Sequence, residues 1–117
     1  MLICGGSRVY GVPRPSSDLD VVVQITPADL SLLRAVADAE KGPAHEDPNV
    51  WSLTFGRLNV IVCLTEASYN VYALGIQALK SRVARSGVKA SRAEAAGLFH
   101  HLQALLRGIR EQGGSAR

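Results

Sequence analysis

Two aspartates near the N-terminus, Asp18 and Asp20, have the spacing of paired metal-binding carboxylates. They stand at the start of an apolar run, Leu19–Ile25, that predicts a buried strand. Side chains two residues apart on a strand project to the same face, so both carboxylates point the same way. Because like charges repel, such a pair needs a positive group between its members, and a divalent cation is the usual one.

A glycine turn precedes this pair. The short apolar run Leu2–Cys4 predicts a strand that enters Gly5-Gly6, and residues 7–10 predict a brief helical segment. A Gly-Gly-Ser turn at a helix start offers backbone N–H groups and the Ser7 hydroxyl to an anion. The turn and the carboxylates together therefore predict a site for a phosphate group that carries a metal ion.

Three short motifs resemble the signature of the nucleotidyltransferase superfamily, which has the polymerase-beta-like fold. They are Gly5-Gly6-Ser7, Tyr10-Gly11 and Ser17-Asp18-Leu19-Asp20. The resemblance is greatest to the small kanamycin-nucleotidyltransferase-like and minimal nucleotidyltransferase branches, and it covers about residues 2–65, roughly half of the chain. It implies an α/β (α+β) fold in which helices pack on a mixed sheet of three to four strands, followed here by two C-terminal helices.

The resemblance also implies a function and a set of site residues. The turn would hold a nucleoside triphosphate, and the carboxylates would bind two magnesium ions, or manganese in their place. A third carboxylate on a later strand completes the site in the family, and here its position corresponds to Asn59. The nucleotide-binding candidates are thus Gly5, Gly6, Ser7, Arg8 and Ser17, the metal ligands are Asp18 and Asp20, and the catalytic candidates are Asp18, Asp20 and Asn59.

Asn59 separates two functional hypotheses. An asparagine can lend an oxygen to a metal, but it adds no negative charge and cannot accept a proton from the attacking group. The first hypothesis is a metal-dependent nucleotidyltransferase of weakened activity whose acceptor, a protein, an RNA or a small molecule, is not specified by the sequence. The second is an inactive homologue that binds a nucleotide, a nucleic acid or a protein. A third interpretation assigns no function to these motifs and takes them as a tight turn and a loop end.

Length and composition limit the architecture. A chain of 117 residues, 47% of them hydrophobic, predicts one domain over residues 1–112 and a flexible tail over residues 113–117. It leaves no room for a separate acceptor-binding domain. No apolar run reaches the length of a membrane helix and no leader pattern is visible, so we expect a cytoplasmic protein that does not enter a membrane. The charge is asymmetric: residues 1–66 carry −3 and residues 67–117 carry +6. This pattern suits a nucleotide or nucleic-acid partner, or simply a solvated helix face.

The remaining elements follow from local signals. Thr26-Pro27 starts a helix that Gly42-Pro43 is expected to end, and two strands, from Trp51 to Phe55 and from Leu58 to Leu64, form a hairpin about Gly56-Arg57. Thr65 caps a helix over residues 66–86, which Gly87 ends. Ser91 and Glu94 form a capping box that opens a last helix.

The two C-terminal helices have two interpretations. They are expected to cover the sheet. The alternative is a DNA-binding helix-turn-helix, which the long turn disfavours and in which the phosphate contacts would be Lys80, Arg82, Arg85, Lys89 and Arg92. The apolar last helix also predicts a homodimer. His45-Glu46-Asp47 is interpreted as a solvated loop rather than a metal site. Cys4 and Cys63 are interpreted as buried, reduced thiols.

Overall fold

A computed structural model describes residues 2–12, 19–43 and 47–115 of the chain, which form an α+β fold. Its elements are β1 (Leu2–Gly5), α1 (Ser7–Tyr10), β2 (Leu19–Gln24), α2 (Pro27–Val36), β3 (Ala39–Pro43), β4 (Val50–Phe55), β5 (Leu58–Cys63), α3 (Glu66–Ser86) and α4 (Arg92–Ser115). The sheet has five strands in the order β1-β2-β5-β4-β3, so the expected three to four strands are corrected to five. Strands β2 and β5 are parallel, and the other neighbours are antiparallel.

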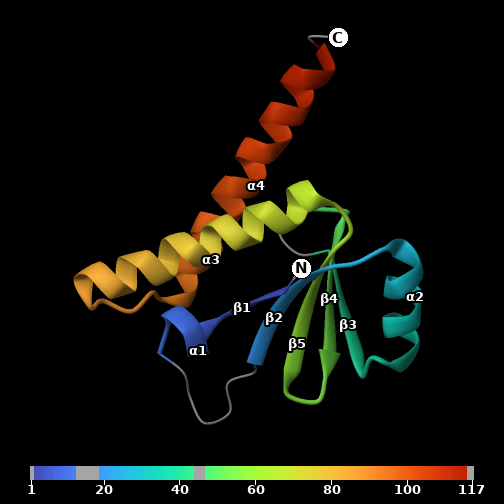
Figure 1. The fold of residues 1–117 in the computed structure, drawn as a ribbon, viewed down its shortest axis with the longest axis horizontal. Coiled ribbons are helices and arrows are strands. Elements are labelled where there is room, and N and C mark those ends of the chain that lie inside the picture. Colours follow the sequence, from blue (N-terminus) through green and yellow to red (C-terminus); the bar gives the residue numbers. More distant parts are fainter. Residues whose placement is uncertain (1, 13–18, 44–46, 116–117) are drawn as a thin grey trace.

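Each face of the sheet has its own apolar core. Val22 of β2 packs with Tyr72 and Ile76 of α3 and with Phe99 of α4 on one face. On the other face Leu30 of α2 belongs to a second cluster, formed with alternate residues of β4 and β5. Figure 1 shows α3 and α4 crossing each other over the sheet, while α2 lies beside β3. The covering role expected for the two C-terminal helices is thereby confirmed.

Strand β5 lies at the centre of the sheet, between β2 and β4. Its apolar side chains Val60 and Val62 face one core and Cys63 faces the other, and all three are buried. The interpretation of this segment as a strand covered on both faces is confirmed. The polar residue Asn59 therefore lies in an otherwise apolar strand.

Helix α2 is shorter than expected. Thr26 caps it as predicted, by accepting a hydrogen bond from the backbone N–H of Asp29 at 3.2 Å. It ends at Val36 instead of continuing to Gly42-Pro43, because residues 39–43 pair with β4 as the edge strand β3. Asp38 fixes this change of direction, since its carboxylate accepts from the Gly56 N–H at 2.6 Å. A proline is tolerated in β3 because the strand lies at an edge of the sheet.

The caps that the sequence predicts for α3 and α4 are confirmed: Thr65 starts α3, Gly87 ends it, and Ser91 starts α4. Thr65 accepts from the backbone N–H of Ser68 at 3.1 Å, and Gly87 ends α3 in the left-handed conformation with φ of 72°. Helix α4 continues through Ser115, three residues beyond its predicted end. None of the helices in the described part of the chain is long and apolar enough to cross a lipid bilayer.

Two interpretations of single residues are wrong. Asp47 is buried, not solvated, and its carboxylate accepts from the Asn49 N–H at 2.9 Å and from the Ser68 hydroxyl at 2.8 Å. His45 and Glu46 lie outside the described residues. Cys4 is exposed, whereas Cys63 is buried as expected, and burial raises the pKa of the Cys63 thiol to about 12.

Candidate active site

Asp20 lies near the start of β2, between β1 and β5. The register pairs it with Gly5 on one side and with Asn59 on the other. Since side chains alternate along a strand, Asp20 lies on the same face as Val22, the face that α3 and α4 cover. One antiparallel pairing, of β1 with β2, and one parallel pairing, of β2 with β5, therefore bring the glycine turn, the aspartate and the asparagine to one place.

A chain of hydrogen bonds crosses three strands at this point. The Asn59 side-chain amide donates from Nδ2 to Asp20 Oδ1 at 3.0 Å, and the Ser52 hydroxyl of β4 donates to Asn59 Oδ1 at 3.0 Å. This arrangement orients the amide: its nitrogen faces the carboxylate and its oxygen faces the serine. In this geometry Asn59 acts as a hydrogen-bond donor to Asp20, and its oxygen is already engaged.

The glycine turn approaches Asp20 so closely that only glycine fits. Gly6 has φ of 81°, in the left-handed region that favours glycine. A Cβ built on Gly6 would lie 1.9 Å from Asp20 Oδ2 and 2.8 Å from its Cγ. The Gly6 carbonyl accepts from the N–H groups of Val9 and Tyr10, which begins α1. The backbone of the turn is thus held against the carboxylate.

A cavity of about 240 Å³ opens beside Asp20. Gly6 and Asp20 lie on its wall, stacked rings of Tyr72 and Phe99 form another part with their centroids 5.1 Å apart, and Arg92 of α4 also lines it. Burial raises the pKa of the Tyr72 hydroxyl, so this group stays protonated at neutral pH. Among the described residues, the lining of the cavity therefore combines the Asp20 carboxylate and the Arg92 guanidinium with mostly apolar and aromatic side chains.

Tyr10 connects the turn to this cavity. It is buried, and desolvation is the main cause that raises the pKa of its hydroxyl, with the nearby Asp20 carboxylate acting in the same direction and a backbone hydrogen bond to Gly6 opposing them. Its carbonyl accepts from the Ala90 N–H at 2.8 Å. The segment that leads into α4 is therefore tied to α1 at the cavity edge.

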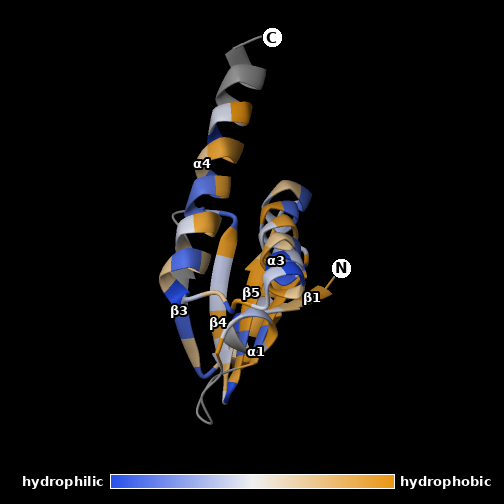
Figure 2. Ribbon diagram, turned by 90° about the vertical axis from the view of Figure 1, so that its left-hand side faces the viewer, coloured by the Kyte–Doolittle hydropathy of each residue, from blue (hydrophilic) through white to orange (hydrophobic). Residues whose placement is uncertain are grey.

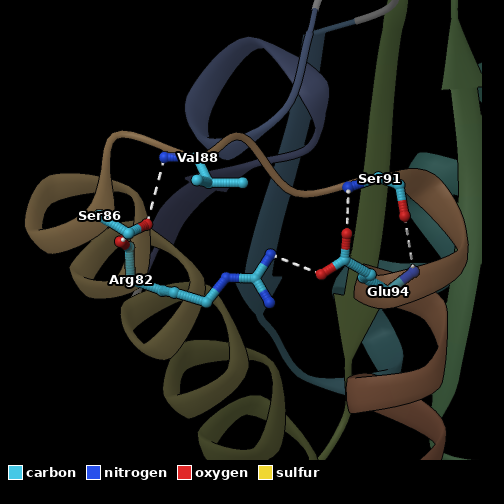
Figure 3. A network of polar contacts seen from close by, with 5 residues as sticks. All are labelled: Arg82, Ser86, Val88, Ser91 and Glu94. Carbon is cyan, nitrogen blue, oxygen red and sulfur yellow. Dashed lines mark hydrogen bonds and ion pairs between the residues drawn. The ribbon is translucent and has the colours of Figure 1, made fainter.

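A polar network holds the joint between α3 and α4 beside the cavity (Figure 3). Arg82 of α3 forms a 2.7 Å ion pair with Glu94 of α4. Glu94 accepts from the Ser91 N–H at 3.4 Å while its own N–H donates to the Ser91 hydroxyl at 3.1 Å, which is the predicted capping box. Ser86 accepts from the Val88 N–H at 3.1 Å. These contacts fix the direction in which α4 leaves the joint.

The structure brings together four of the predicted site residues: Gly5, Gly6, Asp20 and Asn59. Asp18 and Ser17 lie outside the described residues. Ser7 and Arg8 belong to α1, and the description of this helix does not extend to their side chains.

Sequence reasoning missed Ser52 and Arg92 as members of the site. Ser52 could have been found, because the alternation of polar and apolar residues along β4 places it on the same sheet face as Asn59. The sequence predicts for Arg92 only a phosphate contact in the alternative helix-turn-helix. Its place on the wall of the cavity that Asp20 also lines depends on how α4 packs over the sheet.

The described residues supply one carboxylate to the site. Among them, no group of three His, Cys, Asp or Glu side chains is close enough to hold a metal ion. Comparisons of the chain with protein families, with curated proteins and with solved structures found no match. The functional assignment therefore depends on the residues of the site and on the motifs that carry them.

Proposed function

We propose that this chain binds a magnesium nucleoside triphosphate at Asp20 and transfers a nucleoside monophosphate to an acceptor hydroxyl. The observation that carries the proposal is the position of Asp20, which lies between the Gly6 backbone and Asn59 at the wall of a cavity of about 240 Å³. The left-handed backbone of Gly6 and its close approach to Asp20 both exclude other residues, so the turn holds bare backbone against the carboxylate.

The residues fit a magnesium site in part. Asp20 offers a hard carboxylate oxygen, the donor type that magnesium prefers, and the sequence places Asp18 two residues before it. Asn59 stands where the resemblance implies a third carboxylate and turns its nitrogen toward Asp20, so among the described residues no further carboxylate is available there for a second ion. When bound, magnesium neutralises charge on the phosphate oxygens and on the leaving pyrophosphate.

The transfer forms one P–O bond and breaks another, and the acceptor hydroxyl gives up its proton. The acceptor oxygen attacks the α-phosphorus, the bond from that phosphorus to the β-phosphate oxygen breaks, pyrophosphate leaves with the electron pair of that bond, and the acceptor proton passes to water. Within this reaction Gly6 would present backbone groups to the phosphates, Arg92 would attract the anionic nucleotide to the cavity, and Asp20 would orient the metal. Asn59 cannot accept the acceptor proton, so we expect slow turnover.

The hydrogen bond from Asn59 to Asp20 favours a second candidate function, a nucleotide-binding module without catalysis. The Asn59 amide donates a hydrogen bond to Asp20 and so holds its carboxylate in place. Asn59 is also neutral, where the transfer reaction would use a negatively charged carboxylate next to the attacking hydroxyl. Binding of the triphosphate is common to both candidates. Transfer distinguishes them.

Titration calorimetry of the full chain with a panel of nucleoside triphosphates tests the proposal. We expect binding that requires magnesium and that is lost in Asp20→Ala. Asp29→Ala is the matched control, because Asp29 is an exposed aspartate at the start of α2, on the far side of the sheet from the site. Binding to no nucleotide, binding without metal, or equal loss in both variants would contradict the proposal.

A transfer assay then separates the two candidates. Pyrophosphate release, measured with protein, RNA and small hydroxyl acceptors, is expected in the wild type and absent in Asp20→Ala. Magnesium-dependent binding with no release for any acceptor would favour the binding module.

A further inference from the structure

A row of polar side chains crosses three strands of the sheet at the Asp20 site. Asn59 donates to Asp20 Oδ1 at 3.0 Å and accepts from the Ser52 hydroxyl at 3.0 Å. Thr54 of β4 belongs to the same row, because the register places it directly opposite Asn59. Figure 2 shows β5 coloured mainly as hydrophobic, so Asn59 is the polar exception in this strand. The amide of Asn59 thus lies between a carboxylate on β2 and two hydroxyls on β4.

The Thr54 hydroxyl is enclosed and makes no use of its position. Its Oγ1 is shielded from solvent and, within the described part of the chain, has no hydrogen-bond partner. Leaving a buried hydroxyl without a partner is unfavourable, so such a group requires an explanation. Directly opposed residues of an antiparallel pair have Cβ atoms about 4.5 to 5.5 Å apart, which brings the Asn59 amide within reach of this hydroxyl. A second arrangement of the amide would therefore give Thr54 a partner.

The present arrangement of the Asn59 amide opposes a cation on Asp20. The amide nitrogen carries two hydrogens and the positive end of the amide dipole, and it points at Asp20 Oδ1. The other carboxylate oxygen, Oδ2, packs against the Gly6 backbone, where even a Cβ would clash. A cation that bound Asp20 beside Asn59 would therefore meet N–H groups where magnesium needs an oxygen ligand.

Turning the amide over removes this conflict without changing its shape, since the nitrogen and oxygen of an amide are nearly identical in size. We propose that a divalent cation on Asp20 reverses the Asn59 amide. Its oxygen then binds the ion, and the two N–H groups point to β4, where they donate to the hydroxyls of Ser52 and Thr54. Ser52 suits both arrangements, because a hydroxyl can donate or accept. Thr54 is a positioning residue that gains its partner only in the reversed arrangement.

This inference rests on the cation site of the proposed function and names what Asn59 and Thr54 contribute to it. The reversal gives up one hydrogen bond to Asp20 and gains two bonds to hydroxyls, so the polar row stays satisfied. The ion gains a second oxygen but no second negative charge. A site of this kind binds the metal more weakly than two carboxylates would, in agreement with the slow turnover expected above.

Titration of the full chain with Mn²⁺, followed by the electron paramagnetic resonance signal of the free ion, tests the role of Thr54 without nucleotide or turnover. Manganese suits the same oxygen ligands as magnesium. Thr54→Val removes the hydroxyl and keeps the branched shape. We expect its Mn²⁺ affinity to fall about three- to tenfold, the value of one hydrogen bond, while its Tm in EDTA stays equal to wild type or rises. Thr54→Ser keeps the hydroxyl and should bind Mn²⁺ like wild type.

Asn59→Leu gives opposite signs with and without the reversal. If the amide did not turn, its N–H would compete with the ion for Asp20 Oδ1, and removing it would tighten Mn²⁺ binding. Loss of a group behind a metal ligand costs about 10- to 100-fold in affinity, so loss of the ligand itself should weaken binding at least about tenfold. Asn70→Leu is the matched control, because Asn70 is exposed on α3, and circular dichroism verifies that both variants fold.

A crystal structure of the chain with Mn²⁺ shows the reversal directly. We expect the ion on Asp20 and a side-chain atom of Asn59 about 2.1 Å from it, which must be the oxygen because an amide nitrogen is not a ligand. An ion on Asp20 with the Asn59 nitrogen still 3.0 Å from Oδ1 would overturn the proposal. So would unchanged affinity in Thr54→Val or tighter binding in Asn59→Leu. Absence of Mn²⁺ from Asp20 would overturn the proposed function as well, which distinguishes the two failures.

Discussion

Replacing Asn59 by aspartate changes one charge in the hydrogen-bond chain and almost nothing in shape. The substitution turns the donor 3.0 Å from Asp20 Oδ1 into a second carboxylate oxygen. Two unit charges at that distance repel by about 5 to 6 kcal/mol at an effective dielectric of about 20. The pair can relieve this repulsion by binding a proton, which at pH 7 costs a carboxyl of ordinary pKa about 4 kcal/mol. Metal-free Asn59→Asp should therefore be destabilised by at most about 4 kcal/mol.

The sign of the pH dependence follows from the same repulsion. Asp20 and the new carboxylate titrate as a pair with one pKa raised above its unfolded value, so the folded state holds a proton that the unfolded state has lost. The destabilisation therefore grows as pH rises from about 4 to 7 and decreases in acid. Magnesium should reverse this destabilisation, because the attraction between a divalent ion and the added carboxylate a few Å away is worth several kcal/mol before desolvation is subtracted.

Thermal unfolding in EDTA and in magnesium, at pH 5 and pH 7, measures both effects. For a domain of 117 residues 1 kcal/mol changes Tm by about 4 °C, so a difference of even 1 kcal/mol is resolved. Gln77→Glu is the control, since it makes the same amide-to-carboxylate change at an exposed position of α3. If the chain is a weakened transferase, Asn59→Asp should also raise turnover at least about tenfold, which needs only 1.4 kcal/mol of that gain in the transition state. Identical melting of Asn59→Asp and wild type in both buffers would refute the placement of Asn59 against Asp20.

Three further predictions concern the elements that hold the site. Gly6→Ala places a methyl group against the carboxylate and strains a backbone with φ of 81°, so it should abolish nucleotide binding. Gly56→Ala, with φ of 59° in open space, should cost only about 1 to 2 kcal/mol of strain and leave binding intact. Gly75→Ala forces the Phe99 ring of α4 outward. We expect urea denaturation to show that the free energy of unfolding falls by about 1 to 3 kcal/mol, although alanine has the better helix propensity. Gly97→Ala should instead gain about 1 kcal/mol, and a gain in both variants would contradict the close crossing. A hydrogen bond from Arg82 of α3 lowers the pKa of Glu94. The contribution of this pair to folding stability is therefore complete above the unfolded-state pKa of 4.5 and is lost as pH falls through the lowered folded-state pKa. The Tm difference between wild type and Glu94→Gln should accordingly vanish in acid, and a difference that persisted there would exclude the ion pair as its source.

Local signals predicted most of the helices and strands. The caps at Thr26, Thr65 and Ser91 and the left-handed Gly87 depend on interactions within a few residues, so the sequence determines them directly. The alternation in β4 and the apolar run of β5 likewise depend on burial alone. The starts of the three helices and both ends of α3, β4 and β5 agree with these signals to within one residue.

Edge strand β3 could not be predicted in this way. Residues 39–43 contain a glycine and a proline and have no alternating pattern, and they are extended because β4 offers a free edge and Asp38 binds the Gly56 N–H. Burial of Asp47 has a similar origin, since its partner Ser68 lies 21 residues further along the chain. Non-local hydrogen bonds decide both cases, and no local window contains them.

The candidate site was predictable where one strand register determines it. Asn59 lies beside Asp20 because parallel β2 and β5 align them, as the resemblance implied. The direction of the Asn59 amide was not predictable, because it depends on Ser52 of a third strand. The cavity depends on how α4 crosses α3, which the packing of Gly75 against Phe99 decides.

The most direct test of the nucleotide site is a crystal structure of the chain with magnesium and a non-hydrolysable triphosphate. We expect phosphates at the Gly6 turn, an ion on Asp20, and the rest of the nucleotide in the cavity between the sheet and α4. We also expect fewer ions on the Asn59 side in wild type than in Asn59→Asp. A nucleotide bound elsewhere, or a bound nucleotide with no ion at Asp20, would contradict the proposed function.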